Sequence, residues 1–202
     1  MKRYIYLISP QIIKSKKFYN DLNKVLRTNK VMYFQLRLKK KPFKELVKIA
    51  KEIKRITSKN KVKLLINDKP LVAKAVKADG CHIGQKDMNF LNSRNILGQK
   101  KTIGVTCHNS KRLALKAKKM GANYIAFGAF FKSSTKKTTY KANLGLLRWA
   151  RKKINMPIVA IGGINNSNYK KILSNGANFI ACSGYVWKNK NLDPVSAINN
   201  FK

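Results

Sequence analysis

Residues 64–87, LLINDKPLVAKAVKADGCHIGQKD, decide how the rest of the chain is interpreted. Two short apolar runs, LLI and CHI, each predict a strand, and the segment between them has the spacing of an amphipathic helix. A strand, a helix and a strand in this order form a parallel unit, in which both strands point the same way. Asp68 follows the first strand and Asp87 the second, so we expect both at the same end of the sheet.

Asn67, Asp68 and Asp87 are therefore candidate site residues, because α/β folds build their active sites at the carboxyl ends of their strands. The chain has only 7 acidic residues against 45 basic ones, and two of the seven occupy these positions. Paired carboxylates can hold a hard cation such as Mg²⁺. The structural alternative, a turn residue at Asp68 and a helix cap at Asp87, stays open on spacing alone.

The same alternation of strand and helix continues along the chain. Strands are predicted at 3–8, 31–36, 62–66, 80–83, 102–105, 124–127, 157–161 and 179–182, and the helices between them include 42–58 and 165–174. Eight strands in one unbroken series are typical of a single-domain (β/α)8 (TIM) barrel, expected over residues 1–202. A doubly wound sheet is the alternative, but the strand count and the lack of GxGxxG after the first strand argue against it.

The net charge of +38 is extreme, yet the lysines are spread over every predicted helix and loop. The longest basic run is only Lys39-Lys40-Lys41, and no basic tail is present. A diffuse positive surface steers anionic small molecules toward a pocket. We therefore expect anionic substrates as partners, and nucleic acid at most as a non-specific partner.

A cytoplasmic protein is expected, with no membrane partner. No apolar run approaches the length of a membrane span, and the N-terminal run is too short for a signal peptide. The three cysteines, Cys81, Cys107 and Cys182, form no CxxC pair and are expected to be buried in a reducing compartment. A catalytic thiol at Cys107, beside His108, is the less favoured alternative, because neighbours in a strand point to opposite faces.

Further polar residues follow the second and fifth strands. Gln35, Arg37 and Lys39 are spaced by two, so we expect them on one face, where Arg and Lys together suit a diphosphate. Solvated bases at an exposed edge are the alternative. Thr106 and His108 follow the fifth strand, and a lone histidine here is more often structural than catalytic.

Three later segments suit phosphate. The long loop over 128–143 contains SSTK, hydroxyls that can close over phosphate oxygens, although a polar linker is the alternative. Gly162-Gly163 follows the seventh strand and Ser183-Gly184 the eighth, where barrels commonly bind phosphate. A metal, a diphosphate and a monophosphate in one site indicate transfer of the group attached to the diphosphate, a good leaving group when its charge is spread over fixed cations.

Six segments resemble the motifs of the thiamine-phosphate synthase family, in the family's order and spacing from Phe34 to Trp187: FQLRLK, LLINDKPLVAKAVKADGCHIGQKDM, IGVTCHN, YIAFGAFFKSSTKKT, PIVAIGGIN and ANFIACSGYVW. The resemblance implies a (β/α)8 barrel that joins hydroxymethylpyrimidine diphosphate to a thiazole phosphate carboxylate or a close relative. It implies Mg²⁺ as the cofactor and a dissociative route, in which diphosphate leaves first and the thiazole nitrogen captures a pyrimidine-methyl cation.

The resemblance also assigns roles to individual residues. Those that would bind the pyrimidine diphosphate are Gln35, Arg37, Lys39, Asn67, Thr106 and Lys136, and the catalytic residues among them are Arg37, Lys39, Thr106 and Lys136. Asp68 and Asp87 would hold Mg²⁺. Those that would contact the thiazole phosphate are Ser133, Ser134, Thr135, Gly163, Cys182 and Ser183. The chain departs from the family pattern at Lys86, Thr106, Lys132, Ser133 and Cys182, where the family more often has an acidic residue, Ser, Pro, Thr and an aliphatic residue.

Two other functions remain as alternatives. A thiazole tautomerase shares the fold and uses a histidine near the fifth strand, which His108 fits, but it needs no Mg²⁺ and tends to lack the GQxD aspartate. Asp87 and Lys136 therefore favour the synthase. A non-catalytic basic barrel that binds nucleic acid is the third possibility, and the even spread of lysine argues against it. The oligomeric state is not predicted.

Overall fold

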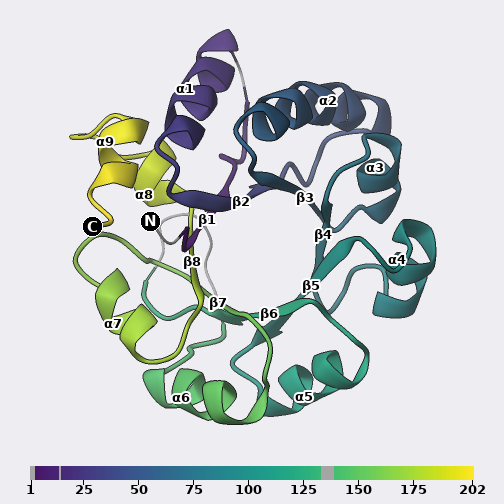
Figure 1. The fold of residues 1–202 in the computed structure, drawn as a ribbon, viewed down its shortest axis with the longest axis vertical. Helices are drawn as coiled ribbons and strands as arrows, with labels where there is room; N and C mark the ends of the chain where they lie inside the picture. The colour runs from purple at the N-terminus through teal and green to yellow at the C-terminus, as the bar shows by residue number, and fades with distance from the viewer. Residues whose placement is uncertain (1–2, 14, 133–138) are drawn as a thin grey trace.

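The computed structural model is a closed ring of parallel strands surrounded by helices (Figure 1). The structure describes residues 3–13, 15–132 and 139–202. Each strand pairs with the next in sequence, and β1 also pairs with β8, which closes the barrel. The strands are β1 Ile5–Ile8, β2 Val31–Leu36, β3 Lys63–Asn67, β4 Gly80–Ile83, β5 Thr102–His108, β6 Tyr124–Gly128, β7 Ile158–Ile161 and β8 Phe179–Cys182. The predicted (β/α)8 barrel is confirmed, and the doubly wound sheet is excluded by the closure.

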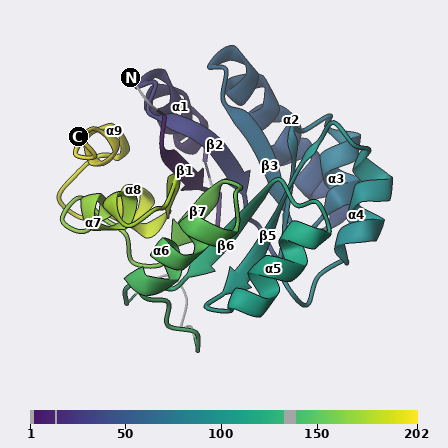
Figure 2. The same ribbon diagram turned by 60° about the horizontal axis from the view of Figure 1, so that its bottom comes forward.

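The helices lie outside the ring, as the turned view in Figure 2 also shows. Their bounds are α1 Lys16–Arg27, α2 Phe43–Lys59, α3 Pro70–Ala75, α4 Phe90–Leu97, α5 Lys111–Lys119, α6 Leu144–Lys153, α7 Tyr169–Ser174, α8 Gly184–Trp187 and α9 Pro194–Asn199. Several begin at a side-chain cap. Asn89, Ser110 and Asn143 each accept a hydrogen bond from the backbone N–H three residues on, which satisfies a donor that the helix leaves unpaired. No helix in the described part of the chain is long and apolar enough to cross a bilayer.

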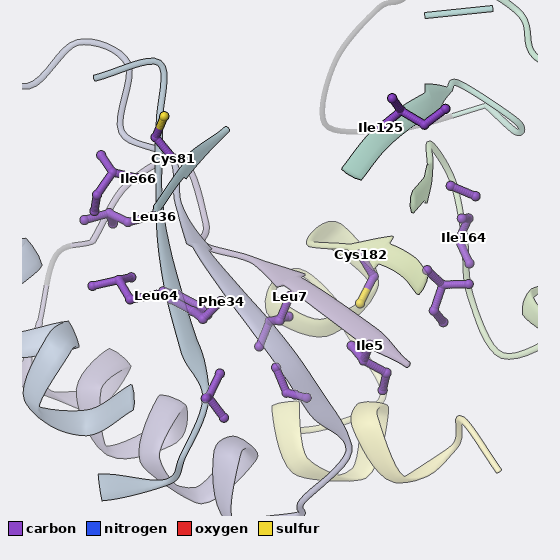
Figure 3. Packing of buried hydrophobic residues seen from close by; sticks show 14 of the residues in the cluster. Ile5, Leu7, Phe34, Leu36, Leu64, Ile66, Cys81, Ile125, Ile164 and Cys182 are labelled. Atoms are coloured by element: carbon purple, nitrogen blue, oxygen red, sulfur yellow. The ribbon is translucent and has the colours of Figure 1, made fainter. Parts of the chain in front are cut away.

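The core has two layers separated by the barrel wall. Strand side chains that face outward pack under the helices, as Figure 3 shows for Ile5, Leu7, Phe34, Leu36 and Leu64. Alternate side chains face inward and fill the barrel: Tyr6, Ile8, Leu65, Tyr124, Ala126, Val159 and Ala181. Packed side chains thus fill the barrel interior. The functional site is expected above it, at the carboxyl ends of the strands.

β2 ends at Leu36, as predicted, and Lys39 and Lys40 form a turn before α2. Two other predicted boundaries are corrected. β5 runs on to His108 through an irregularity in its pairing with β6. α7 begins at Tyr169 rather than at 165, because the preceding segment forms a side-chain turn in which Asn165 Oδ1 accepts the N–H of Ser167.

Candidate functional site

A chain of hydrogen bonds crosses the carboxyl ends of β2 and β3. The buried Gln35 donates from Nε2 to Oδ1 of Asn67 over 3.0 Å, and Asn67 in turn donates from Nδ2 to Oδ2 of Asp68. Gln35 is in the barrel wall and Asp68 is the first residue after β3. This series of hydrogen bonds therefore runs from the barrel interior to its rim. The two amides are held in fixed orientations at the place where the sequence predicts a pyrimidine diphosphate.

Asp68 and Asp87 come together at this rim. Asp68 has a left-handed backbone with φ of 60°, and its N–H donates to the carbonyl of His82 in β4 over 2.8 Å. Asp87 accepts the N–H of Gly84 at Oδ2 over 2.9 Å, so both carboxylates are anchored by backbone groups. Partial burial, together with the hydrogen bond and negative charge of Asp87, raises the pKa of Asp68 to about 6. The prediction that the two carboxylates lie at the same end of the sheet is confirmed.

Basic side chains from the loop after β2 reach the same carboxylates. Lys39 Nζ lies 3.5 Å from Oδ2 of Asp68, and the charges of Lys39 and Arg37 both lower the pKa of Asp68 in part. Gln35 is in β2, whereas Arg37 and Lys39 follow the end of the strand at Leu36. The prediction that the three point to one side is supported, because Gln35 bonds Asn67 beside Asp68 and the charges of Arg37 and Lys39 act on Asp68.

The carboxylate pair suits a divalent cation. Two carboxylates that repel each other in a partly buried position gain stability when a cation lies between them. Within residues 3–13, 15–132 and 139–202, no group of three or more His, Cys, Asp or Glu side chains could hold a metal. Two carboxylates with the remaining positions left to water and phosphate oxygens are the usual ligand set of Mg²⁺.

Thr106 belongs to a second polar chain, which sequence reasoning missed. Its hydroxyl lies 2.8 Å from Nε2 of His82, and Nδ1 of His82 lies 2.8 Å from the hydroxyl of Tyr124, which is 2.8 Å from that of Tyr6. The carbonyl of Thr106 accepts a hydrogen bond from Nε2 of Gln85. This bond links β5 to the loop that carries Asp87. The sequence shows these polar and aromatic residues in predicted strands, but it does not show that they contact one another across the barrel.

His108 stands apart from that chain. It is the last residue of β5, has φ of 51°, and stacks on Tyr140 with ring centroids 4.0 Å apart. Cys107 is fully buried, and burial raises the pKa of its thiol to about 12. A thiol with so high a pKa is a poor nucleophile, so the catalytic thiol at Cys107 is not supported.

The turns after β7 and β8 lie on the other side of the rim. Gly163 has φ of 63°, and a Cβ built there would lie 2.3 Å from the carbonyl oxygen of Lys132, so only glycine fits. Ser183 Oγ donates to the carbonyl of Ser9, whose own hydroxyl accepts the N–H of Arg37 over 2.9 Å. Ser9, missed by sequence reasoning, thus links the turn after β8 to the loop after β2, and its signal was a polar residue directly after β1.

The remaining predicted phosphate contacts fall in the loop after β6. Ser133, Ser134, Thr135 and Lys136 lie outside the described residues. The described ends of this loop are paired, because Ala129 donates to the carbonyl of Tyr140 over 3.0 Å and Ala142 donates to that of Ala129 over 2.8 Å. Cys182, the other predicted contact, is buried in β8, and burial raises the pKa of its thiol to about 12.

Comparisons with known proteins agree with this geometry. Residues 5–186 match the family model described as thiamine monophosphate synthase. The chain is 54% identical to the thiamine-phosphate synthase of Pelagibacter ubique, over 100% of this chain and 97% of the relative, and 34% identical to that of Rhodospirillum centenum, over 98% and 95%. The solved thiamine phosphate pyrophosphorylase from Pyrococcus furiosus superposes with a TM-score of 0.86 and 28% identity, covering 98% of this chain and 93% of that one. The chain therefore belongs to the thiamine-phosphate synthase family of transferases.

Proposed function

We propose that this protein joins hydroxymethylpyrimidine diphosphate to a thiazole phosphate, with release of diphosphate. The observation that carries the proposal is the pair of contacting carboxylates, Asp68 and Asp87, with Lys39 Nζ 3.5 Å from Asp68. An acidic pair beside basic side chains suits a diphosphate and a divalent cation together, because the pair would hold the cation and the bases would add positive charge for the diphosphate.

Asp68 and Asp87 would hold Mg²⁺ in this proposal. When bound, the ion would neutralise charge on the diphosphate and favour its departure. Burial and the neighbouring charge of Asp87 raise the pKa of Asp68, and a bound cation would offset both effects. Lys86, where relatives more often carry an acidic residue, places one positive charge beside Asp87 in the sequence, and we expect it to weaken the affinity for the ion.

Arg37, Lys39, Thr106 and Lys136 are the residues that we propose for catalysis. The carbon–oxygen bond to the diphosphate breaks in the proposed dissociative route, so negative charge grows on the leaving oxygens. Arg37 and Lys39 would stabilise that charge as cations, and the Thr106 hydroxyl would donate a hydrogen bond to it. Lys136 lies outside the described residues, and its role stays a prediction.

Gln35 and Asn67 would orient the pyrimidine. An amide offers both a donor and an acceptor, as the edge of an aminopyrimidine does. The hydrogen bond from Gln35 to Asn67 fixes both amides before substrate binds, so little side-chain entropy remains to be lost. The ring would then be held while its diphosphate departs.

The thiazole phosphate is assigned to the opposite side of the rim. Gly163, Cys182 and Ser183 would contact it there, together with Ser133, Ser134 and Thr135 of the loop after β6. The turn at Gly163 is packed too tightly for any side chain, which lets backbone groups approach a ligand closely. The family resemblance supports these roles, and they stay predictions, as do the cytoplasmic location and the at most non-specific binding of nucleic acid.

The proposal is tested by product formation from purified protein. Both substrates are supplied with Mg²⁺, each is omitted in turn, and thiamine phosphate is measured by mass spectrometry. We expect product only when both substrates are present. A folded protein that forms no product but isomerises the thiazole carboxylate would be a tautomerase instead.

A further inference from the structure

One buried row of side chains connects the barrel interior to the proposed diphosphate site. His82 in β4, Gly104 in β5 and Tyr124 in β6 are register neighbours across three adjacent strands. A Cβ built on Gly104 would lie 1.8 Å from Cζ of Tyr124, so the ring occupies the space that a side chain at 104 would fill. The glycine therefore lets Tyr124 reach across β5 and stack on His82, with ring centroids 5.6 Å apart and planes at 19°.

The hydrogen bonds along this row form a single chain. It runs from the Tyr6 hydroxyl to the Tyr124 hydroxyl, then to Nδ1 and through the ring to Nε2 of His82, and ends at the hydroxyl of Thr106, with 2.8 Å at each of its three links. Tyr6 and Tyr124 are 2% exposed and His82 is 9% exposed. The protons of Tyr6, Tyr124 and His82 must therefore find their acceptors inside the chain, because these three side chains are buried away from bulk water.

Only one direction of donation satisfies every buried donor. If Tyr6 donates to Tyr124, then Tyr124 donates to Nδ1 of His82, and the proton on Nε2 of His82 is donated to Thr106. In the reverse direction Thr106 donates to His82, which donates to Tyr124, which donates to Tyr6. The Tyr6 proton is then left without an acceptor, since Tyr124 is its sole hydrogen-bond partner among the residues that the structure describes. A buried donor without an acceptor is costly, so the first direction is favoured.

We propose that His82 is a positioning residue, held by Tyr124 as the neutral tautomer protonated on Nε2, so that Thr106 accepts from His82 and keeps its own proton for an anionic ligand. The inference rests on the proposed function in one respect, the role of Thr106 toward the diphosphate. In the opposite tautomer Thr106 would donate inward and turn its lone pairs toward the anion. The direction of the chain therefore decides whether the hydroxyl attracts or repels the diphosphate.

The charge state of these groups supports the argument. Burial lowers the pKa of His82 to about 4, and burial raises the pKa of Tyr124 well above its usual value. Both groups are therefore neutral at neutral pH, where a neutral imidazole has one donor and one acceptor nitrogen and its tautomer is set by its partners.

The tautomer can be measured directly, because the chain has only two histidines. Nitrogen-15 NMR of protein labelled at histidine distinguishes the protonated from the unprotonated ring nitrogen, and His108→Asn assigns the remaining signals to His82. We expect His82 with a proton on Nε2 and none on Nδ1. A proton on Nδ1, or a fully protonated ring at neutral pH, would overturn the inference. The spectrum is recorded without substrate, so its result does not depend on the proposed synthase activity.

Kinetics then test whether the tautomer acts through Thr106. Tyr124→Phe removes the donor to Nδ1, and we expect a mixed tautomer and a loss in kcat of about tenfold with little change in KM. Tyr33→Phe is the matched control, because it deletes a hydroxyl from the same aromatic cluster, outside the hydrogen-bonded chain. In a Thr106→Val background, Tyr124→Phe is expected to cause no further loss. An equal loss in both backgrounds, or a Tyr124→Phe protein with the tautomer and kcat of the wild type, contradicts the positioning role.

Discussion

Asp68 and Asp87 lie close enough at the carboxyl ends of β3 and β4 for Asp87 to raise the pKa of Asp68. The two residues are 19 positions apart in sequence, and the parallel unit between them brings them together. Partial burial is the larger cause of the raised pKa of Asp68, and the negative charge of Asp87 adds to it. The fold thus keeps two like charges adjacent, an arrangement that a bound cation stabilises.

Asp68→Asn and Asp87→Asn should each reduce diphosphate release by roughly 100-fold or more, because each removes one carboxylate ligand of the proposed ion. Asn is chosen since it tolerates the left-handed backbone at position 68. The rate is measured over a Mg²⁺ titration, and the apparent dissociation constant for Mg²⁺ should rise. Glu52→Gln, which removes an exposed carboxylate paired with Arg55 on α2, is the control and should leave the rate unchanged. Equal activity in all four proteins would rule out the carboxylate pair as the metal site.

Thr106→Val should lower kcat/KM by about 10- to 100-fold, because a hydrogen bond to a charged group contributes about 1.5–3 kcal/mol. Thr106→Ser keeps the hydroxyl and should retain most of the activity. Steady-state kinetics on both variants check this, with circular dichroism to confirm folding. A Val variant as active as the Ser variant would show that the hydroxyl does not contact the diphosphate.

His108→Asn separates the synthase from the tautomerase. Its ring stacks on Tyr140 and takes no part in the chain through Thr106 among the described residues. We expect the variant to keep diphosphate release within a few-fold of the wild type, measured side by side with the isomerisation of thiazole phosphate carboxylate. Asn accepts the positive φ at this position, so folding should be preserved. Loss of all turnover would instead assign the chemistry to His108.

Burial of neutral His82 should make stability depend on pH. Its pKa is lowered from 6.5 to about 4 in the folded protein, so between these values the unfolded state binds the proton and the folded state does not. The free energy of unfolding is therefore expected to fall as the pH drops from 6.5 to 4, by up to about 3 kcal/mol from this group. His82→Gln should lose that part of the pH dependence in urea unfolding.

Asp68 acts in the opposite direction over an overlapping range. Its pKa is raised from 3.8 to about 6 in the folded protein, so the folded state binds more protons and the free energy of unfolding falls as the pH rises through this range. The pH dependence of the free energy of unfolding of the wild type is thus the sum of two opposing contributions. The difference between wild type and His82→Gln isolates the histidine, and an identical slope in the two proteins would contradict its burial in the neutral form.

The fold and the acidic pair could be predicted from sequence because both depend on local order. Eight apolar runs alternating with helical spacing leave few topologies, and a parallel unit places Asp68 beside Asp87 whatever the details of packing. The spacing of Gln35, Arg37 and Lys39 also indicates their common side, although only Gln35 is in β2 and the chain turns toward Pro42 and α2 after Leu38.

The chain through His82 was beyond sequence reasoning because it depends on packing across the barrel. Tyr124 reaches His82 only because Gly104, on the strand between them, leaves room for the ring. Neither the period of a strand nor the type of its residues indicates such a contact between β4 and β6. Ser9 was missed for the same reason, since its partners, Arg37 and Ser183, follow β2 and β8, the strands on either side of β1.

The central claim is that Asp68 and Asp87 hold a metal ion on which diphosphate release depends. The most direct measurement is the rate of diphosphate release from both substrates with Mg²⁺, with excess EDTA, and with EDTA followed by added Mg²⁺. We expect release with Mg²⁺, none with EDTA, and recovery on adding the ion back. Release that continues unchanged in EDTA would contradict the claim.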